Sequence, residues 1–422
     1  MRWWALPDGR TPMFDIVLRR ASVAGHAGLV DIGIAGGRIA ALAPGLPAGH
    51  EEIEAGGRLV CAGFVETHIH LDKSRLLDRC PCGAGTLADA VASVARAKRR
   101  FTAEDVRQRA GRTLEQAILQ GTTRLRSHVE VDPRVGLVSF EALKALKRDY
   151  AFAVDLSVCV FPQEGLTNDP GCEALLAAAL SDGADAIGGA PYMDPDPAGQ
   201  LATIFRLARD FDVDIDLHLD FDLDPSRSDM AEVCRLTDAH GWGGRVAIGH
   251  ATKLSAMIPA TFEAAARRLA DAGVAVTVLP ATDLFLNGRN ASHNVPRGVA
   301  PAHSLARLGV TASIASNNVL NPFTPYGDCS LLRMANLYAN LAQLGSDEDL
   351  GLCFDMVTSQ PARLMNLRNY GLATGASADL VLLDCAAPAD AVREISPPLW
   401  GMKAGRKTFE RPPAVLKRQI EA

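Results

Sequence analysis

Two histidines, His68 and His70, end an apolar run that begins at Phe64. On a β-strand, residues at i and i+2 point to the same face, so both imidazoles can bind a single metal ion. The spacing therefore predicts a strand whose C-terminal end carries a metal site.

Three more histidines, His128, His218 and His250, each close another apolar run. For any one of them, a hydrogen-bonded structural role is an equally good explanation. Purely structural histidines would have no reason to gather at strand ends, however, so the set as a whole predicts a site.

Polar residues occupy every even position from Asp214 to Asp222. A period of two would place Asp216, His218 and Asp220 on one face of a strand. A half-exposed antiparallel strand gives the same alternation, but in a barrel of parallel strands it indicates a polar lumen. So many carboxylates in a lumen need cations, and a metal ion is the simplest one.

These strands belong to a repeated unit, in which an apolar, β-branched run, a polar turn and a helical period follow one another. We place the eight strands at residues 62–69, 122–130, 152–161, 185–190, 213–219, 245–250, 274–280 and 310–316. Helical periods fill residues 87–118, 173–180, 201–210, 230–240, 255–272 and 331–344. Eight such units predict an α/β fold, the (β/α)₈ TIM barrel, whose sites lie at the C-terminal ends of the strands. A doubly wound sheet is the alternative, but no Gly-rich phosphate loop follows the first strand.

The two ends of the chain contain short apolar runs divided by turns. We expect residues 14–61 and 371–422 to form one small β-sandwich domain that flanks the barrel of residues 62–370. Residues 1–13 are expected to be a loose extension.

Composition and charge limit the partners. Hydrophobic residues make up 48% of the chain and charged residues 22%, which is typical of a globular α/β enzyme. The net charge of −6 argues against nucleic acid and anionic membranes, since both attract basic patches. No apolar run approaches the length of a membrane span, and the first residues lack the apolar core of a signal peptide. The nine scattered cysteines do not suggest a disulfide framework, so a cytoplasmic protein is predicted.

Eight ordered motifs resemble the amidohydrolase superfamily, specifically its branch of cytosine deaminase and N-isopropylammelide amidohydrolase. They are GFVETHIHLDK (63–73), SHVEV (127–131), VFPQEGL (160–166), DLH (216–218), GH (249–250), LNGR (286–289), PYG (325–327) and GASADL (375–380).

The resemblance implies a hydrolase with one divalent metal ion, zinc or iron, bound by His68, His70 and His218. A water molecule that the ion makes acidic would attack a ring carbon that carries an amino group. His250 would hold that water, and Gln163 would read the substrate ring by hydrogen bonds. Binuclear relatives have a carboxylated lysine at the end of strand four, and because residues 186–191 contain none, a single ion is favoured.

Two positions depart from the family pattern. The strand-eight aspartate, which binds the metal and accepts a proton, is replaced by Asn317. An amide oxygen can bind the metal, so Asn317 is expected to be a metal ligand and part of the catalytic site, but an amide cannot act as a base near neutral pH. A glutamate three residues after the strand-five histidine is replaced by Phe221. Losing both acid–base groups would cost about 10²–10⁴ in rate unless another group compensates.

Four carboxylates are candidates for that compensation. Asp220 is expected to face the metal and to act as the base, and Asp222 lies just beyond it. Asp328 and Glu130 are nearby alternatives. For Asp222 and Asp328, a solvated loop position or a helix cap is the competing interpretation.

We therefore expect a metal-dependent aminohydrolase of a nitrogen heterocycle, such as cytosine or a related pyrimidine or triazine. His128, Asp222 and Phe221 are expected to contact this small substrate. Lys73 either binds an anionic or carbonyl group of it or only forms an ion pair with Asp72. Hydrolysis of a cyclic or linear amide is the second hypothesis, and a ligand-binding barrel without turnover is the third. The resemblance also implies a homo-oligomer.

Overall fold

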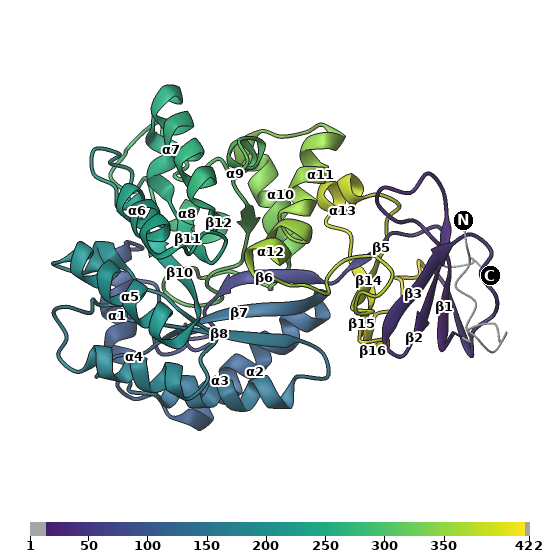
Figure 1. Cartoon of the computed structure of the whole chain (residues 1–422), viewed down its shortest axis with the longest axis horizontal. Coiled ribbons are helices and arrows are strands. Elements are labelled where there is room, and N and C mark those ends of the chain that lie inside the picture. The colour runs from purple at the N-terminus through teal and green to yellow at the C-terminus, as the bar shows by residue number, and fades with distance from the viewer. Residues whose placement is uncertain (1–13, 418–422) are drawn as a thin grey trace. The chain divides into compact units, whose positions relative to one another are not determined.

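The computed structural model describes residues 14–417, so the extension predicted at residues 1–13 lies outside the described residues. The chain divides into two compact units (Figure 1). One contains the residues up to Gly63 together with those from Asn369 onward, and the other runs from Phe64 to Arg368.

The first unit contains two four-stranded sheets, ordered β3-β2-β1-β4 and β16-β15-β14-β5. Their strands are β1 Ile16–Ala21, β2 Val30–Ala35, β3 Arg38–Ala43, β4 Glu51–Glu54, β5 Val60–Ala62, β14 Leu380–Leu383, β15 Pro398–Lys403 and β16 Arg406–Glu410. A helix, α13 Pro388–Glu394, lies between β14 and β15 in the sequence. The hairpin of β2 and β3 closes through Gly36 and Gly37, whose φ angles of 57° and 73° suit a two-residue turn.

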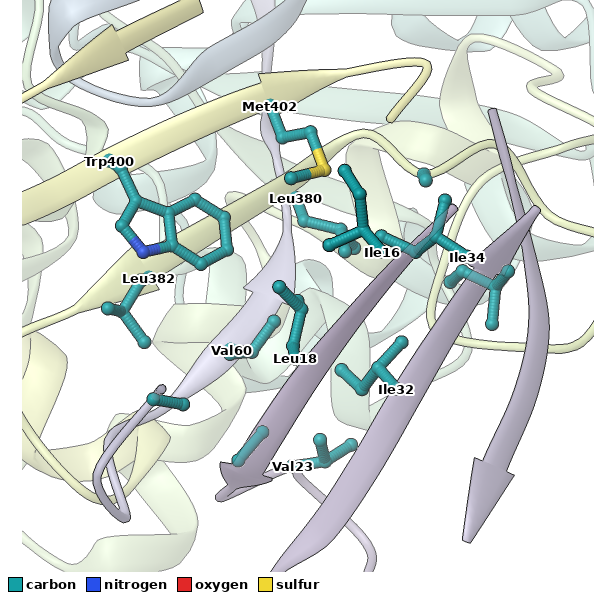
Figure 2. Close-up of a cluster of buried hydrophobic side chains, with 14 of the residues drawn as sticks. Ile16, Leu18, Val23, Ile32, Ile34, Val60, Leu380, Leu382, Trp400 and Met402 are labelled. Carbon is teal, nitrogen blue, oxygen red and sulfur yellow. The ribbon is translucent and has the colours of Figure 1, made fainter. Parts of the chain in front are cut away.

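The two ends of the chain share one core in this unit. Strand β5 pairs antiparallel with β14, so the N-terminal segment supplies an edge strand of the C-terminal sheet. Figure 2 shows apolar side chains from both segments turned toward one another, among them Leu18, Ile32, Val60, Leu380 and Trp400. The β-sandwich predicted from the two ends of the chain is confirmed.

The second unit contains eight parallel strands in sequential order from β6 to β13. Their bounds are β6 Phe64–Ile69, β7 Thr122–Glu130, β8 Asp155–Phe161, β9 Ala186–Ile187, β10 Asp214–Leu219, β11 Val246–His250, β12 Val274–Val278 and β13 Ala312–Ile314. Just after β13, Asn317 forms a parallel bridge with Ile69 at the end of β6. This bridge joins the last strand to the first, and the predicted TIM barrel is confirmed.

Helices connect these strands and lie outside them (Figure 1). They are α1 Leu87–Lys98, α2 Ala103–Leu119, α3 Val138–Asp149, α4 Cys172–Ser181, α5 Pro197–Phe211, α6 Met230–His240, α7 Pro259–Ala272, α8 Pro280–Leu286, α9 Ala302–Arg307, α10 Leu331–Ala342, α11 Asp347–Asp355 and α12 Ser359–Leu364, with short 3₁₀ turns at Pro191–Met193 and Thr252–Ala256. None of the helices between residues 14 and 417 combines the length and the apolar character that a bilayer crossing needs.

The single helical stretch expected at residues 87–118 is instead two helices, α1 and α2. The break lies at Thr102, which has an extended backbone and whose hydroxyl accepts a hydrogen bond from the Asp105 N–H. A threonine N-cap of this kind begins a new helix, and a hydrophobic period by itself does not reveal such a cap.

Candidate active site

The three histidines expected to bind a metal converge at the C-terminal end of the barrel. Nε2 of His68 and Nε2 of His70 each lie 3.1 Å from Nε2 of His218. Two nitrogens that each lie about 2.0–2.1 Å from a tetrahedral ion are about 3.3 Å apart, so this spacing suits a shared ion.

The chemistry of these side chains also fits a cation. Burial, helped by positive charge on neighbouring groups, lowers the pKa of His68, His70 and His218 well below the usual value. The imidazoles are therefore neutral and keep a lone pair for a metal ion. Room for the His68 ring depends on Gly249, because a Cβ there would lie 3.1 Å from His68 Nδ1. The residues present therefore fit a divalent metal ion.

His128 is the one other histidine close enough to be considered a ligand. Ring nitrogens of His68, His128 and His218 all lie within 4.8 Å of one another. However, Nε2 of His128 faces Asp216 Oδ1 at 3.4 Å, and its ring stacks on His68 at 3.7 Å between centroids. It does not line the cavity described below. That His128 contacts substrate stays a prediction, which the position of its ring against His68 does not support.

The acidic lumen is balanced by protein groups. Asp216 is fully buried, as expected, and its Oδ2 accepts a hydrogen bond from Arg126 at 2.9 Å. No sequence motif singles out Arg126, which lies on β7 and whose cationic head is buried beside Asp216. The lumen carboxylate consequently does not require a metal ion, and it is the three histidines that indicate one.

Asp220 does not face the histidines. Strand β10 ends at Leu219, and Asp220 has a left-handed backbone, with a φ of 52°. Its carboxylate accepts hydrogen bonds from Ser228 Oγ at 2.5 Å and from the Asp229 N–H at 3.2 Å. The prediction that Asp220 continues the period of two is wrong, because the left-handed residue turns its side chain toward the loop before α6.

The other candidate acids are also occupied elsewhere. Asp222 lies on the wall of an outer pocket, half exposed, with an oxygen 3.1 Å from Lys253 Nζ. Asp328 caps the turn before α10 and pairs with Arg333 at 2.8 Å. Neither residue lines the cavity that contains the histidines.

A buried histidine–aspartate pair lies beside the three histidines and has the chemistry of a proton-transfer group. His250 Nδ1 lies 2.6 Å from Asp283 Oδ1, and burial raises the pKa of that carboxyl group. His250 itself lines the cavity, and its φ of 68° is a strained value of the kind found at functional sites. The sequence motifs did not single out Asp283. The available signal was an acidic residue soon after the apolar run of β12.

Lys73 reaches the same cavity as a buried cation. Its Nζ donates to Glu130 Oε1 at 2.8 Å and to Gln163 Oε1 at 3.0 Å, and it lies 4.4 Å from the centroid of the Phe323 ring. Asp72 instead accepts a hydrogen bond from the Lys73 backbone N–H. The alternative in which Lys73 only pairs with Asp72 is therefore wrong.

Lys98 holds Glu130, the carboxylate that accepts a hydrogen bond from Lys73. Its buried Nζ donates to Glu130 Oε2 at 2.7 Å, Asp132 Oδ2 at 2.5 Å and Glu164 Oε2 at 2.6 Å. Glu130 therefore bridges Lys98 and Lys73. Nothing in the sequence pattern distinguishes Lys98 from an ordinary lysine at the end of a helix.

Replacing Glu164 by glutamine is expected to stabilise the protein at alkaline pH. Burial, together with repulsion from Glu130, raises the pKa of Glu164 to about 7. The folded protein therefore holds this proton more tightly than the unfolded chain, and stability is lost as the pH rises from the usual carboxyl value toward 7. Glu164→Gln should gain about 1–3 kcal/mol at pH 8, after a discount for partial exposure, and almost nothing at pH 4. Urea midpoints at the two pH values measure this, and a less stable variant at pH 8 would contradict it.

Two adjoining cavities surround these groups. The polar lining of the inner cavity comes from His70, Lys73, Gln163, Tyr192, His218, His250, Thr282, Asn317 and Asn318. An outer pocket of about 460 Å³ shares Leu87, Phe221 and Leu286 with the inner one, so apolar side chains separate the two. The Phe221 ring lies 4.4 Å from that of His250. This places Phe221 at the edge of the inner cavity.

The comparisons with known proteins agree with this arrangement. Residues 139–398 match the amidohydrolase family. The N-isopropylammelide isopropyl amidohydrolase of Pseudomonas sp. (strain ADP) is 28% identical over 93% of this chain and 96% of its own. The pterin deaminase of Rhizobium rhizogenes is 29% identical over 83% and 81%. The crystal structure of 5-methylcytosine deaminase from Klebsiella pneumoniae with 5-fluorocytosine superposes with a TM-score of 0.91 at 28% identity, covering 95% of this chain and 99% of that one.

Proposed function

This chain belongs to the amidohydrolase family, whose members are metal-dependent hydrolases, and from this premise we propose that it is an aminohydrolase of a small nitrogen heterocycle. We further propose that it uses one divalent ion, zinc or iron, held by His68, His70 and His218. The observation that carries the proposal is the convergence of three buried, neutral imidazoles beside a separate proton-transfer pair. The relatives named as a pterin deaminase, a 5-methylcytosine deaminase and an N-isopropylammelide hydrolase support a heterocyclic substrate.

When bound, the metal ion supplies the charge that makes a water molecule acidic near neutral pH. His250 is the base in our proposal. Its Nδ1 is occupied by Asp283, which leaves Nε2 to take the proton from the attacking water. The water oxygen bonds to the ring carbon, the bond from that carbon to the exocyclic nitrogen breaks, and His250 returns the proton to the departing amine.

Lys73, Gln163 and Phe221 orient the substrate ring in our proposal. Lys73 has a third N–H beyond those given to Glu130 and Gln163, and this donor is available for an oxo group or ring anion of the substrate. Gln163 Oε1 accepts a hydrogen bond from Lys73, so Gln163 Nε2 is available to donate to a ring nitrogen or carbonyl oxygen of the substrate. Phe221 contributes an apolar wall where the family has a carboxylate.

Replacing Lys73 by methionine is expected to raise KM about 10–100-fold, since a hydrogen bond to a charged donor contributes about 1.5–3 kcal/mol. Glu130 keeps its bond to Lys98 in this variant, so the fold should persist. Steady-state kinetics would measure the change. Lys144→Met is the matched control, because it breaks an ion pair with Asp182 and a contact with the Phe140 ring, both away from the cavity. An unchanged KM would remove Lys73 from the substrate site.

Product analysis separates the two hydrolytic hypotheses. In ¹⁸O-labelled water, an aminohydrolase yields a ring that carries one labelled oxygen, together with free ammonia or an alkylamine. Hydrolysis of a cyclic amide instead opens the ring and retains every nitrogen in one product. Mass spectrometry of products from cytosine, pterin and ammelide-type rings would distinguish these outcomes. A ring-opened product would overturn the aminohydrolase proposal.

We also propose a cytoplasmic location, which the free state of all nine cysteines supports. The homo-oligomer implied by the family resemblance stays a prediction.

A further inference from the structure

Three buried asparagines form a hydrogen-bonded chain beside the inner cavity: Asn317, Asn318 and Asn321. The chain starts at Asn321, whose Oδ1 accepts hydrogen bonds from the backbone N–H groups of Phe323 at 2.9 Å and Thr324 at 3.1 Å. A backbone N–H can only donate. These two contacts therefore fix which atom of the Asn321 amide is oxygen.

The orientation of the Asn321 amide determines the orientation of the other two amides. Asn321 Nδ2 donates to the carbonyl oxygen of Lys73 at 3.1 Å and to Asn318 Oδ1 at 2.7 Å. Asn318 must then present its Nδ2 to the next residue, and it donates to Asn317 Oδ1 at 2.8 Å. The backbone at Asn321 thus determines the orientation of the Asn317 amide.

The other end of that amide is unpaired. Asn317 Nδ2 is buried and has no hydrogen-bond partner among residues 14–417. An unsatisfied buried donor costs about 1–3 kcal/mol, so this group needs a partner that the protein itself does not supply. Asn317 lines the cavity together with His70 and His218, and its backbone pairs with His68 near the end of β6 and with His70 just after it.

We propose that Asn317 offers the cavity its Nδ2 rather than its oxygen, and that Asn318 and Asn321 are positioning residues for this orientation. Asn317 is then not a metal ligand, in contrast to the expectation from the sequence. Its N–H₂ donates to the attacking water or to a substrate oxygen, and it stabilises the negative charge that grows there. This inference rests on the proposed function, because it presumes a metal ion at the three histidines.

Zinc affinity tests the role of Asn317 without any substrate. In competition with a chelator, the zinc affinity of Asn317→Ala should lie within about threefold of the wild-type value. The zinc affinity of His70→Ala should be at least about 100-fold lower. Asn317→Asp can accept from Asn318 with one oxygen and offer the other to the ion, so its affinity should rise at least about tenfold. A folded Asn317→Ala that loses tenfold or more would show that Oδ1 is a ligand and would overturn the proposal.

Asn318→Asp tests the relay. A carboxylate cannot donate, so the Asn317 amide should turn over, give its Nδ2 to residue 318 and aim its oxygen at the ion. We expect a lower kcat with little change in KM, and tighter zinc binding. In Asn317→Ala/Asn318→Asp the gain in affinity should vanish, whereas a gain caused by charge alone would persist. Asn340→Asp, an exposed amide on α10, is the matched control.

The outcomes separate the two proposals. Wild-type protein that binds no zinc would contradict both the proposed function and this inference. Normal zinc binding by the wild-type protein with an unchanged kcat in Asn318→Asp, or with an affinity gain that survives in the double variant, would contradict the inference alone.

Discussion

Replacing His218 or His70 by alanine should reduce metal affinity at least about 100-fold and leave kcat/KM near background, because each loses a direct ligand. His218 lies at the centre of the cluster, with its Nε2 3.1 Å from the Nε2 atoms of both His68 and His70. Metal content after dialysis, measured by plasma mass spectrometry, is the direct readout.

Two further variants make this prediction specific. His128→Ala should retain the metal, since the His128 Nε2 faces Asp216 and not the cluster. His26→Ala, on an exposed turn, should match the wild-type protein in every respect. If His128→Ala lost the metal and His70→Ala retained it, His128 would be the metal ligand in place of His70.

The second large effect is expected at the proton-transfer pair. His250→Gln and Asp283→Asn should each lower kcat by about 10²–10⁴ while metal content stays at the wild-type level. Asp283 holds the His250 ring by its Nδ1, so either change removes the properly oriented Nε2 base. Comparing kcat with metal content in the same preparations measures this.

The carboxylates rejected on geometry serve as controls for that experiment. Asp222→Asn and Asp328→Asn should change kcat by less than about threefold, because surface ion pairs contribute little. If Asp222→Asn instead abolished turnover with Asp283→Asn unaffected, the base would have to be reassigned.

Local patterns allowed the fold and part of the site to be predicted. Alternation is a property of a strand's own sequence, so the polar positions of β6 and β10 predicted that His68, His70 and His218 share one face of the barrel. Parallel strands then bring their C-terminal ends together. The fold followed from the same periodicity, which located each of the eight strands.

The remaining features depended on contacts that no local pattern encodes. Asp220 was misplaced because it follows Leu219, the last residue of the strand, and has a left-handed backbone, which aspartate tolerates better than most residues. Asp283 and Lys98 become functional or structural only when segments distant in the sequence meet. The direction of the Asn317 amide is set by backbone donors at Phe323 and Thr324, and it could not be read from an asparagine in a motif.

Release of ammonia by metal-depleted and metal-restored protein tests the central claim most directly. The protein is stripped with a chelator and then reconstituted with zinc or ferrous iron. Ammonia or alkylamine is then measured with a panel of amino-substituted pyrimidines, pterins and triazines, beside His218→Ala. We predict release from at least one ring, dependent on about one metal ion per chain and absent in the variant. Full metal occupancy without release from any member of the panel would contradict the account and would favour a barrel that binds ligands without turnover.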